Sequence, residues 1–294
     1  MICFPNAKIN LGLHITGKRP DGYHTIESIF YPIPLKDALE VVIRDKTTFT
    51  QTGIPLETTF TQTGIPLEAT PEENLVMKAY DLMAKKYKIP VLDIFLKKAI
   101  PSGAGLGGGS SDAAFMLKML CELCKLPISE ADLIKMSGTL GADCPFFMRN
   151  TPVIVTGTGD IFQPADSLLK GYLLYVVKPP FSIATKEAYA MVKPQKPEFS
   201  LDRLSALPVH EWKYVLKNDF EPSIFKKYPF IEKIKEELYS LGAIYASMSG
   251  SGSAVFGLFN PTASGLVNPT VSEPFEKTIS PVFHDCFVWK SILE

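Results

Sequence analysis

Hydrophobic and polar residues alternate along residues 8–15, Lys-Ile-Asn-Leu-Gly-Leu-His-Ile. A period of two predicts a β-strand with one buried face. The apolar positions would face a core: Ile9, Leu11, Leu13 and Ile15. The other positions share the opposite face: Lys8, Asn10, Gly12 and His14. That second face is either an ordinary solvated strand surface or the floor of a ligand site.

Other apolar runs predict strands at residues 39–44, 91–96, 153–156, 172–177 and 254–259. Helical spacing predicts helices at about 71–86, from the glycine-rich stretch to about 124, and at 230–241. A short helix that carries Tyr189 follows Ser182-Ile-Ala-Thr185. The mixture of strands and helices indicates an α/β (or α+β) chain. We place a domain boundary near residues 160–170, which gives an N-terminal domain 1–162 and a C-terminal domain 163–294.

The most informative stretch is Pro101-Ser-Gly-Ala-Gly-Leu-Gly-Gly-Gly-Ser-Ser-Asp112, between a predicted strand and a predicted helix. Glycine lets the backbone adopt positive φ and approach a ligand closely. Free N–H groups at a helix N-terminus form an anion site that the helix dipole reinforces. The stretch therefore predicts a phosphate-binding loop.

Three alternatives fit less well. Gly103-x-Gly105-x-x-Gly108 matches the dinucleotide pattern, but Pro101 stands at its mouth and no acid on a following strand is evident about 20 residues on. A P-loop needs Lys after its last glycine, where this chain has Ser110. A flexible linker would not be followed at once by an apolar helix.

Two loops and one carboxylate are further candidates. Pro20-Asp-Gly22 predicts a turn that delivers Tyr23 and His24 side by side, suited to a planar heterocycle or simply to a packed hairpin. Asp143 lies between small residues and an apolar run, either as a helix cap or turn residue or as a partly desolvated carboxylate facing a cleft. A second glycine–serine stretch, 249–253, is either a phosphate-covering loop or a plain tight turn.

Residues 47–57, Thr-Thr-Phe-Thr-Gln-Thr-Gly-Ile-Pro-Leu-Glu, recur unchanged as residues 58–68. In one continuous strand the two copies would present opposite faces, because side chains alternate with period two. We interpret the duplication as a surplus surface arm, since loop insertions cost little entropy.

The composition is that of an ordinary globular chain of 294 residues, 46% hydrophobic and 21% charged, with net charge −1. Nothing indicates a nucleic-acid or membrane surface, and we see no secretion signal or membrane-spanning run. Five cysteines indicate reduced thiols and a cytoplasmic protein. Cys121 and Cys124 have C-x-x-C spacing within a helix, which favours core thiols over metal or redox use.

Together, these motifs resemble the GHMP kinases. The resemblance is carried by residues 101–114, by Pro5-Asn-Ala-Lys-Ile-Asn-Leu-Gly-Leu13, by Arg19-Pro-Asp-Gly-Tyr-His24 and by Gly141-Ala-Asp-Cys-Pro-Phe-Phe147. It covers residues 1 to about 260. The motifs narrow it to members that phosphorylate a cytidine-diphosphate-linked methylerythritol on the non-mevalonate route to isoprenoid precursors. It implies a ribosomal-S5-like N-terminal domain and a ferredoxin-like C-terminal domain.

The resemblance also implies roles. Asp143 matches the catalytic acid and Lys8 its partner. ATP would be bound by the loop residues and by Asn74, near the adenosine: Pro101, Ser102, Gly103, Ala104, Gly105, Leu106, Gly107, Gly108, Gly109, Ser110, Ser111 and Asn74. The alcohol substrate would contact Asn10, Tyr23, His24, Thr185 and Tyr189. Tyr23 and Tyr189 would stack on cytosine and His24 would read its edge.

The expected cofactors are ATP and Mg²⁺, the latter with no ligands assigned, and the expected state is a monomer or weak homodimer. Two rival functions stay open. One is another small-alcohol kinase of the same family, of homoserine or mevalonate type. The Asp-Gly-Tyr-His loop speaks against it, because a substrate without a base would make no use of that loop. The other is a nucleotide-binding regulator without catalysis, against which the presence of both Lys8 and Asp143 speaks.

Overall fold

The computed structural model describes residues 1–44, 57–66, 70–260 and 280–294. Its strands are β1 (Ile2–Cys3), β2 (Asn6–Lys18), β3 (His24–Lys36), β4 (Ala38–Ile43), β5 (Thr59–Gly64), β6 (Leu92–Lys98), β7 (Val153–Thr156), β8 (Ile161–Pro164), β9 (Leu173–Lys178), β10 (Tyr245–Met248), β11 (Val255–Phe259) and β12 (Phe287–Ile292). Its α-helices are α1 (Leu75–Ala84), α2 (Gly108–Leu123), α3 (Glu130–Gly138), α4 (Cys144–Arg149), α5 (Thr185–Met191), α6 (Trp212–Val215), α7 (Glu221–Lys227) and α8 (Pro229–Ser240). Short 3₁₀ turns lie at Pro71–Glu73, Leu201–Ala206, Val209–Glu211 and Pro281–Phe283. The mixed α and β class expected from the sequence is confirmed.

The chain separates into two compact units. The first comprises Met1–Ala7, Leu35–Ser102 and Gly107–Thr151, and the second comprises Lys8–Pro34, Gly103–Leu106 and Pro152–Glu294. The glycine-rich stretch thus contributes residues to both units. The division into domains 1–162 and 163–294 stays a prediction.

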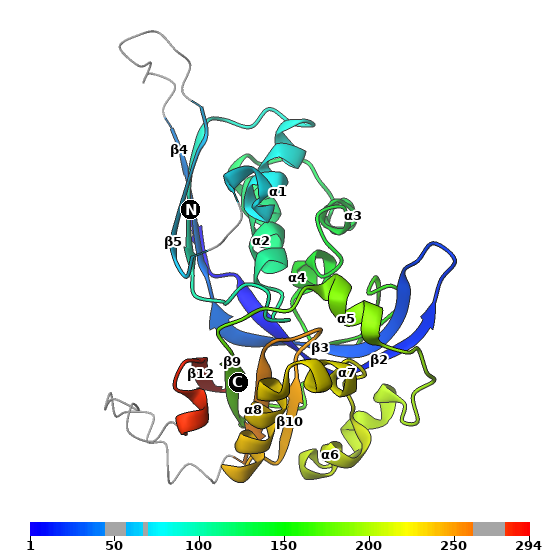
Figure 1. Ribbon diagram of the computed structural model, residues 1–294. Coiled ribbons are helices and arrows are strands. Elements are labelled where there is room, and N and C mark those ends of the chain that lie inside the picture. Colours follow the sequence, from blue (N-terminus) through cyan, green and yellow to red (C-terminus); the bar gives the residue numbers. More distant parts are fainter. Residues whose placement is uncertain (45–56, 67–69, 261–279) are drawn as a thin grey trace. The chain divides into compact units, whose positions relative to one another are not determined.

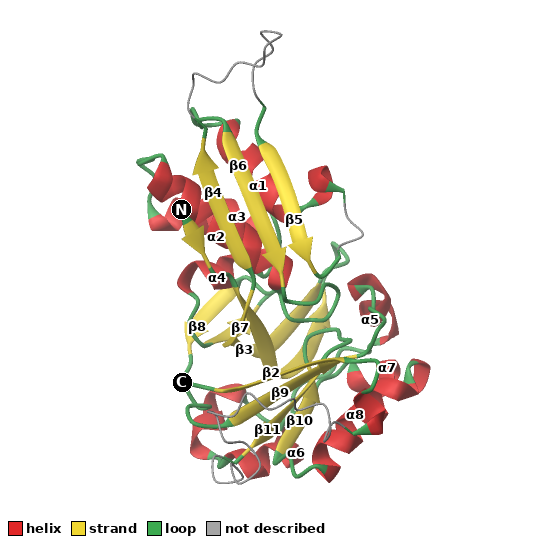
Figure 2. Cartoon of the chain, turned by 90° about the vertical axis from the view of Figure 1, so that its left-hand side faces the viewer, coloured by secondary structure: helices red, strands yellow, loops and turns green. Residues whose placement is uncertain are grey.

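The first unit is a four-stranded sheet in the order β1-β4-β6-β5, with helices α1 and α2 on one side (Figure 2). β4 pairs antiparallel with β6, and β5 pairs parallel with β6 from Thr59↔Asp93 to Gly64↔Lys98. The apolar residues that alternate along β6 are buried: Leu92, Ile94 and Leu96. This is the alternation expected of a sheet with one covered face.

β5 corrects the interpretation of the repeat as a surplus arm. The strand is the second copy's Thr-Phe-Thr-Gln-Thr-Gly, and it forms one edge of the sheet. The Thr59 hydroxyl hydrogen-bonds the Asp93 carboxylate, which also pairs with Arg44. Threonines fit an edge strand because their branched side chains favour extended backbone and their hydroxyls tolerate water. Most of the first copy, 47–56, lies outside the described residues.

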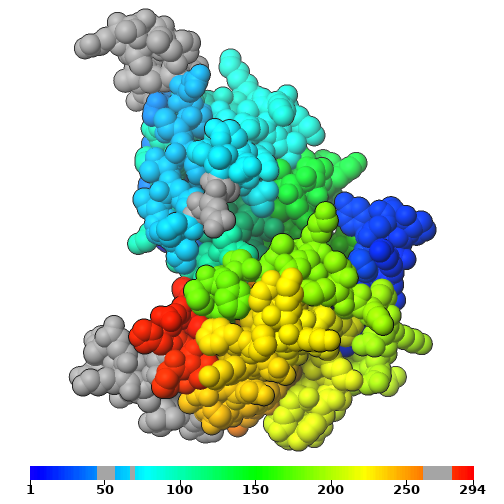
Figure 3. Space-filling view, in the orientation of Figure 1, coloured from blue at the N-terminus to red at the C-terminus, as the bar shows by residue number. Residues whose placement is uncertain are grey.

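The second unit holds two sheets, β2-β3-β7-β8 and β10-β11-β9-β12. β2 and β3 are long strands that run side by side (Figure 1). β12 pairs antiparallel with β9 and brings the C-terminal segment into the second sheet. In the space-filling view this red segment adjoins the yellow surface of α8 (Figure 3).

α8 shows how the sequence pattern becomes packing. Ile231, Ile234 and Leu238 recur at helical spacing and are buried, and Gly242 ends the helix with φ +95°. Leu241 continues the apolar spacing but is 46% exposed, because it follows the last helical turn. The helix packs against β10 and β11 and thus covers the sheet that leads to the second glycine–serine loop.

No helix within the described ranges combines the length and the apolar character that a membrane span requires.

Candidate functional site

β2 is buried on both of its faces. The apolar face carries Ile9, Leu11, Leu13 and Ile15 as expected, but Lys8, Asn10 and His14 are only 3%, 1% and 4% exposed. The alternative of a solvated strand face is therefore wrong. Burying polar groups requires hydrogen-bond partners, and these partners define the site.

A hydrogen-bond chain runs across the polar face of β2. The Lys8 ammonium donates to Asn10 Oδ1 at 2.6 Å, and Asn10 Nδ2 donates to the Ser28 hydroxyl at 2.9 Å. Ser28 donates to the Gly12 carbonyl at 2.6 Å. Lys8 Nζ also lies 4.6 Å from the centroid of the Phe30 ring. A buried ammonium is thus held in one position beside an oriented carboxamide.

The loop segment 103–106 lies against this strand. The Lys8 backbone N–H donates to the Leu106 carbonyl at 2.9 Å. Gly103, Gly105 and Gly107 have φ of +60°, +74° and +70°, whereas the residues between them have negative φ. Such alternation turns successive N–H groups toward a common side and forms a concave anion site.

The second glycine–serine loop packs on the first. The Ser249 hydroxyl donates to the Gly105 carbonyl at 2.9 Å, and Ala254 N–H donates to the Ala104 carbonyl at 3.1 Å. A Cβ at Gly105 would lie 1.9 Å from the Ser249 carbonyl oxygen. The backbones approach so closely that only glycine fits at Gly105. The Gly252 N–H donates to the Ser249 carbonyl at 3.0 Å, so the stretch 249–252 is a tight turn, and its contact with phosphates stays a prediction.

The first unit contains the helical end of the glycine loop. Gly107 stands before α2, whose first turn carries Ser110. A Cβ at Gly141 would lie 3.3 Å from the Cys144 sulfur and 3.5 Å from the Ser110 hydroxyl, so both side chains lie on the same side of Gly141. Burial raises the pKa of Cys144 to about 11, and Ser110 lowers it only in part, so the thiol stays protonated. Ser110 therefore lies beside the turn that carries Asp143.

Asp143 is half-buried and immediately precedes α4. It occupies the capping position, but its carboxylate makes no capping hydrogen bond to the helix. The helix-cap alternative is therefore not supported. Asp143 does lie in a turn, which the Cys144 N–H closes by donating to the Gly141 carbonyl at 3.1 Å, and a catalytic role for its carboxylate stays a prediction. Asp143 belongs to the first unit and Lys8 to the second.

A buried ionic cluster lies behind the start of α2. Lys98 donates to Asp112 at 2.7 Å and pairs with Asp37, and all three residues are at most 3% exposed. Burial raises the pKa of Asp112 to about 7. Burial by itself lowers the pKa of Lys98, but the two carboxylates outweigh it, so the net shift is upward and the ammonium stays charged. A Cβ at Gly108 would lie 3.4 Å from Lys98 Nζ.

The expected base-binding residues lie in the second unit. The rings of His24 and Tyr189 stack with centroids 4.9 Å apart and planes inclined by 27°. Burial, with a smaller contribution from Lys18, lowers the pKa of His24, which favours a neutral imidazole with one donor and one acceptor nitrogen. Tyr23 is 69% exposed, so most of its surface faces solvent.

Two further predicted residues have defined local roles. Thr185 begins α5, and its hydroxyl lies 3.3 Å from that of Ser251 in the second glycine–serine loop. Asn74 caps α1 by accepting a hydrogen bond from Val76 N–H at 2.9 Å. The cap explains Asn74 locally, and its contact with adenosine stays a prediction.

Sequence reasoning missed Ser28, Lys98 and Asn218. Ser28 stands in an apolar strand, and Lys98 follows the predicted strand as one of two adjacent lysines. Asn218 lies in a stretch without regular periodicity. The roles of these three polar side chains depend on hydrogen-bond partners that are distant in the sequence, so no local pattern indicates them.

Cys121 and Cys124 are half-buried free thiols of α2 and the residue after it. Within the described part of the chain, no three His, Cys, Asp or Glu side chains are grouped as metal ligands.

Comparison with known proteins identifies the family. Residues 74–150 match the GHMP kinases N terminal domain, and residues 205–273 match the GHMP kinases C terminal domain. The chain is 54% identical to 4-diphosphocytidyl-2-C-methyl-D-erythritol kinase of Parabacteroides distasonis and 46% identical to that of Porphyromonas gingivalis, each over all of both chains. A crystal structure of 4-(cytidine 5'-diphospho)-2C-methyl-D-erythritol kinase superposes with TM-score 0.77 at 28% identity, covering 99% of this chain and 98% of the other. The chain therefore belongs to the 4-diphosphocytidyl-2-C-methyl-D-erythritol kinases, a family within the GHMP kinases.

Proposed function

We propose that this chain transfers the γ-phosphoryl group of ATP to a hydroxyl of the methylerythritol part of 4-diphosphocytidyl-2-C-methyl-D-erythritol. By its family it is an ATP-dependent kinase. The observation that carries the proposal is the buried Lys8–Asn10–Ser28 chain on β2, against which the glycine segment 103–106 is packed.

The chemistry requires positioning, charge neutralisation and a group that orients the attacking hydroxyl. We assign the hydroxyl proton to Asp143, a half-buried carboxylate in the turn before α4 that matches the catalytic acid of the family motif. Lys8 would stabilise the negative charge that develops at the transferred group. Its bond to Asn10 limits the positions open to the ammonium, so little reorganisation is needed during the reaction.

The triphosphate would be bound by backbone amides of residues 101–111 and by the N-terminus of α2. Positive φ at alternate glycines supports this role. A Cβ at Gly103 would lie 2.7 Å from the Ser182 side chain and one at Gly105 would lie 1.9 Å from the Ser249 carbonyl oxygen, so neither position has room for a larger residue. Mg²⁺ is part of the proposal because it neutralises phosphate charge in such reactions; we assign it no protein ligand.

The cytosine would be recognised by Tyr23, His24 and Tyr189. A flat ring can stack on an aromatic side chain, and a neutral imidazole offers both a donor and an acceptor to the base edge. The stacked pair of His24 and Tyr189 is the aromatic platform: Tyr189 and the exposed Tyr23 would offer ring faces to the base, and His24 would offer its ring nitrogens to the base edge. Thr185 and Ser251, which lie together, would face the diphosphate.

The rival within the family is a kinase for a small alcohol that lacks a base. Homoserine and mevalonate kinases superpose on this chain at 12–17% identity, a likeness that shows the fold alone. The aromatic platform favours the cytidylyl substrate over both. A cytoplasmic location completes the proposal, because the five cysteines are all free thiols.

The test is ATP consumption by the purified protein with four alcohols in parallel: the cytidylyl methylerythritol, mevalonate, homoserine and galactose. We expect ATP-dependent turnover with the first alone and a product heavier by one phosphoryl group. Preference for any of the other three would contradict the substrate assignment. Nucleotide binding without turnover on any of them would favour the regulator.

A further inference from the structure

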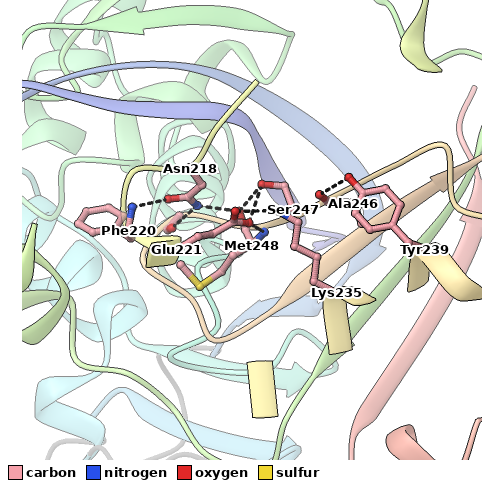
Figure 4. Close-up of polar contacts among 9 residues, drawn as sticks. Asn218, Phe220, Glu221, Lys235, Tyr239, Ala246, Ser247 and Met248 are labelled. Atoms are coloured by element: carbon pink, nitrogen blue, oxygen red, sulfur yellow. Dashed lines mark hydrogen bonds and ion pairs between the residues drawn. The ribbon is translucent and has the colours of Figure 1, made fainter. Parts of the chain in front are cut away.

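Asn218 connects segments that lie far apart in the sequence. It is 2% exposed, and its Nδ2 donates to the carbonyls of Met248 and Gly250, both at 2.8 Å (Figure 4). Its Oδ1 accepts from Phe220 N–H at 3.0 Å. Two carbonyls on one side and one N–H on the other fix the orientation of the amide.

The backbone around Asn218 is anchored to β2. Leu13 N–H donates to the Lys217 carbonyl and Asp219 N–H donates to the Leu13 carbonyl, both at 2.9 Å. The Asp219 carboxylate also accepts from Ile15 N–H at 2.8 Å. Asn218 is thus held from the same strand that carries Lys8 and Asn10.

The Nδ2 bonds determine where Gly250 lies. Gly250 has φ +57°, and a Cβ there would be 3.3 Å from both Asn10 Oδ1 and Gly105 Cα. Asn10 Oδ1 is the atom that accepts the hydrogen bond from the Lys8 ammonium. Gly250 therefore packs directly on the amide beside the lysine and on the glycine loop.

The hydrogen bond that Asn218 Oδ1 accepts links Asn218 to the aromatic residues of the site. Asn218 fixes the backbone of Phe220, whose ring meets that of Tyr189 edge to face, with centroids 4.9 Å apart and planes at 87°. Tyr189 in turn stacks on His24. One buried amide thus supports both the aromatic platform and the loop over Asn10.

We propose that Asn218 is a positioning residue that fixes the spacing between the base-binding platform and the phosphoryl-transfer end of the site. The inference deepens the proposed function and rests on it. Only an amide of this size supplies two donors and one acceptor here. An aspartate would place a carboxylate oxygen, in the position of Nδ2, against the two carbonyl oxygens of Met248 and Gly250.

The test compares Asn218→Asp, which keeps the shape of the side chain, with the control Glu221→Gln. Glu221 is also buried, and its carboxylate accepts from Met248 N–H at 2.8 Å and from Lys235 at 2.6 Å. It holds the same loop at its base but makes no contact with Gly250 among the described hydrogen bonds. Both variants remove a buried polar interaction, but we expect only Asn218→Asp to change the spacing between the base-binding platform and the phosphoryl-transfer end of the site.

We expect Asn218→Asp to lower kcat by about 10²-fold, the scale for a displacement of about 1 Å at a reacting centre. Glu221→Gln should lower the melting temperature and leave kcat within about threefold of wild type, since it leaves the reacting groups in place. Rates are normalised to the folded fraction, measured by circular dichroism. Equal kcat values for Asn218→Asp and wild type, or equal losses in both variants, would overturn the inference.

If Asn218→Asp does not fold, Gly250→Ala tests the same spacing, because its Cβ would press on Asn10 Oδ1. A kcat loss there supports the inference, and unchanged kcat overturns it. The wild-type rate with the cytidylyl substrate tests the proposed function separately. The ratio of variant to wild-type kcat is measured with whichever alcohol the wild type phosphorylates, so the two failures are distinguishable.

Discussion

Gly105 offers the sharpest test of how the two glycine loops fit together. Its φ of +74° costs an alanine about 1 to 2 kcal/mol. A Cβ would lie 1.9 Å from the Ser249 carbonyl oxygen, whereas ordinary contact begins at 3.4 Å, so the backbones must separate by roughly 1.5 Å. Separation breaks the hydrogen bonds Ser249–Gly105 and Ala254–Ala104, each worth about 1 kcal/mol net.

Gly105→Ala should therefore lower the free energy of unfolding by about 3 to 4 kcal/mol. Gly242→Ala is the matched control, because Gly242 also has positive φ, +95°, but a Cβ there meets nothing within 4 Å. It should cost only the strain of about 1 to 2 kcal/mol.

Urea unfolding measures the two stabilities, and steady-state kinetics measures the KM for ATP. Displaced loop amides should raise the KM of Gly105→Ala at least about tenfold, equivalent to about 1.4 kcal/mol of binding. Gly242→Ala should keep the wild-type KM. If the two variants lose equal stability and both keep the wild-type KM, the close packing of the loops has no part in nucleotide binding.

Three further predictions concern other parts of the chain. Tyr23→Ala should raise KM for the cytidylyl substrate more than KM for ATP, whereas the equally exposed Tyr214 can be changed to Ala without effect; equal rises in both KM values would count against stacking. Asp112 faces Lys98, Asp37 and Cys3, and burial raises its pKa to about 7 from 3.8. Its contribution to the free energy of unfolding is therefore complete below pH 3.8 and is lost as pH rises through about 7. Asp112→Asn should flatten that fall in the free energy of unfolding, and an unchanged pH profile would show that another group titrates. Deleting 58–68 gives the same polypeptide as deleting 47–57, so one Thr-rich run remains to pair with β6 and activity should persist; loss of turnover would mean that both copies are needed.

Local patterns predicted much of the fold, but not the partners of its polar groups. Alternation predicted β2, yet it could not show that Lys8 and Asn10 are buried, because Ser28 comes from another strand. The duplicated segment gave no hint of β5, since a polar threonine run becomes a strand only when β6 is there to pair with it. The strand end that carries Lys98 likewise acquires its role from Asp37 and Asp112.

The candidate site was predicted mainly by motif resemblance. Glycine spacing alone indicated a phosphate loop, and the structure supports this with alternating positive φ. The contact between His24 and Tyr189 joins residues far apart in the chain, which spacing could not predict. Asn218 stayed hidden because its function depends on three backbone groups rather than on neighbouring residues.

The central claim is that Lys8 and Asp143 act together on one phosphoryl transfer. Its most direct test is the kcat of Lys8→Met, Asp143→Asn and the double variant at saturating ATP and cytidylyl substrate. Each single change should lower kcat by about 10²- to 10⁴-fold, and the double variant should be hardly slower than the slower single variant, because groups that act as a unit are not additive. Near-normal turnover of Asp143→Asn, or losses that multiply in the double variant, would contradict the claim.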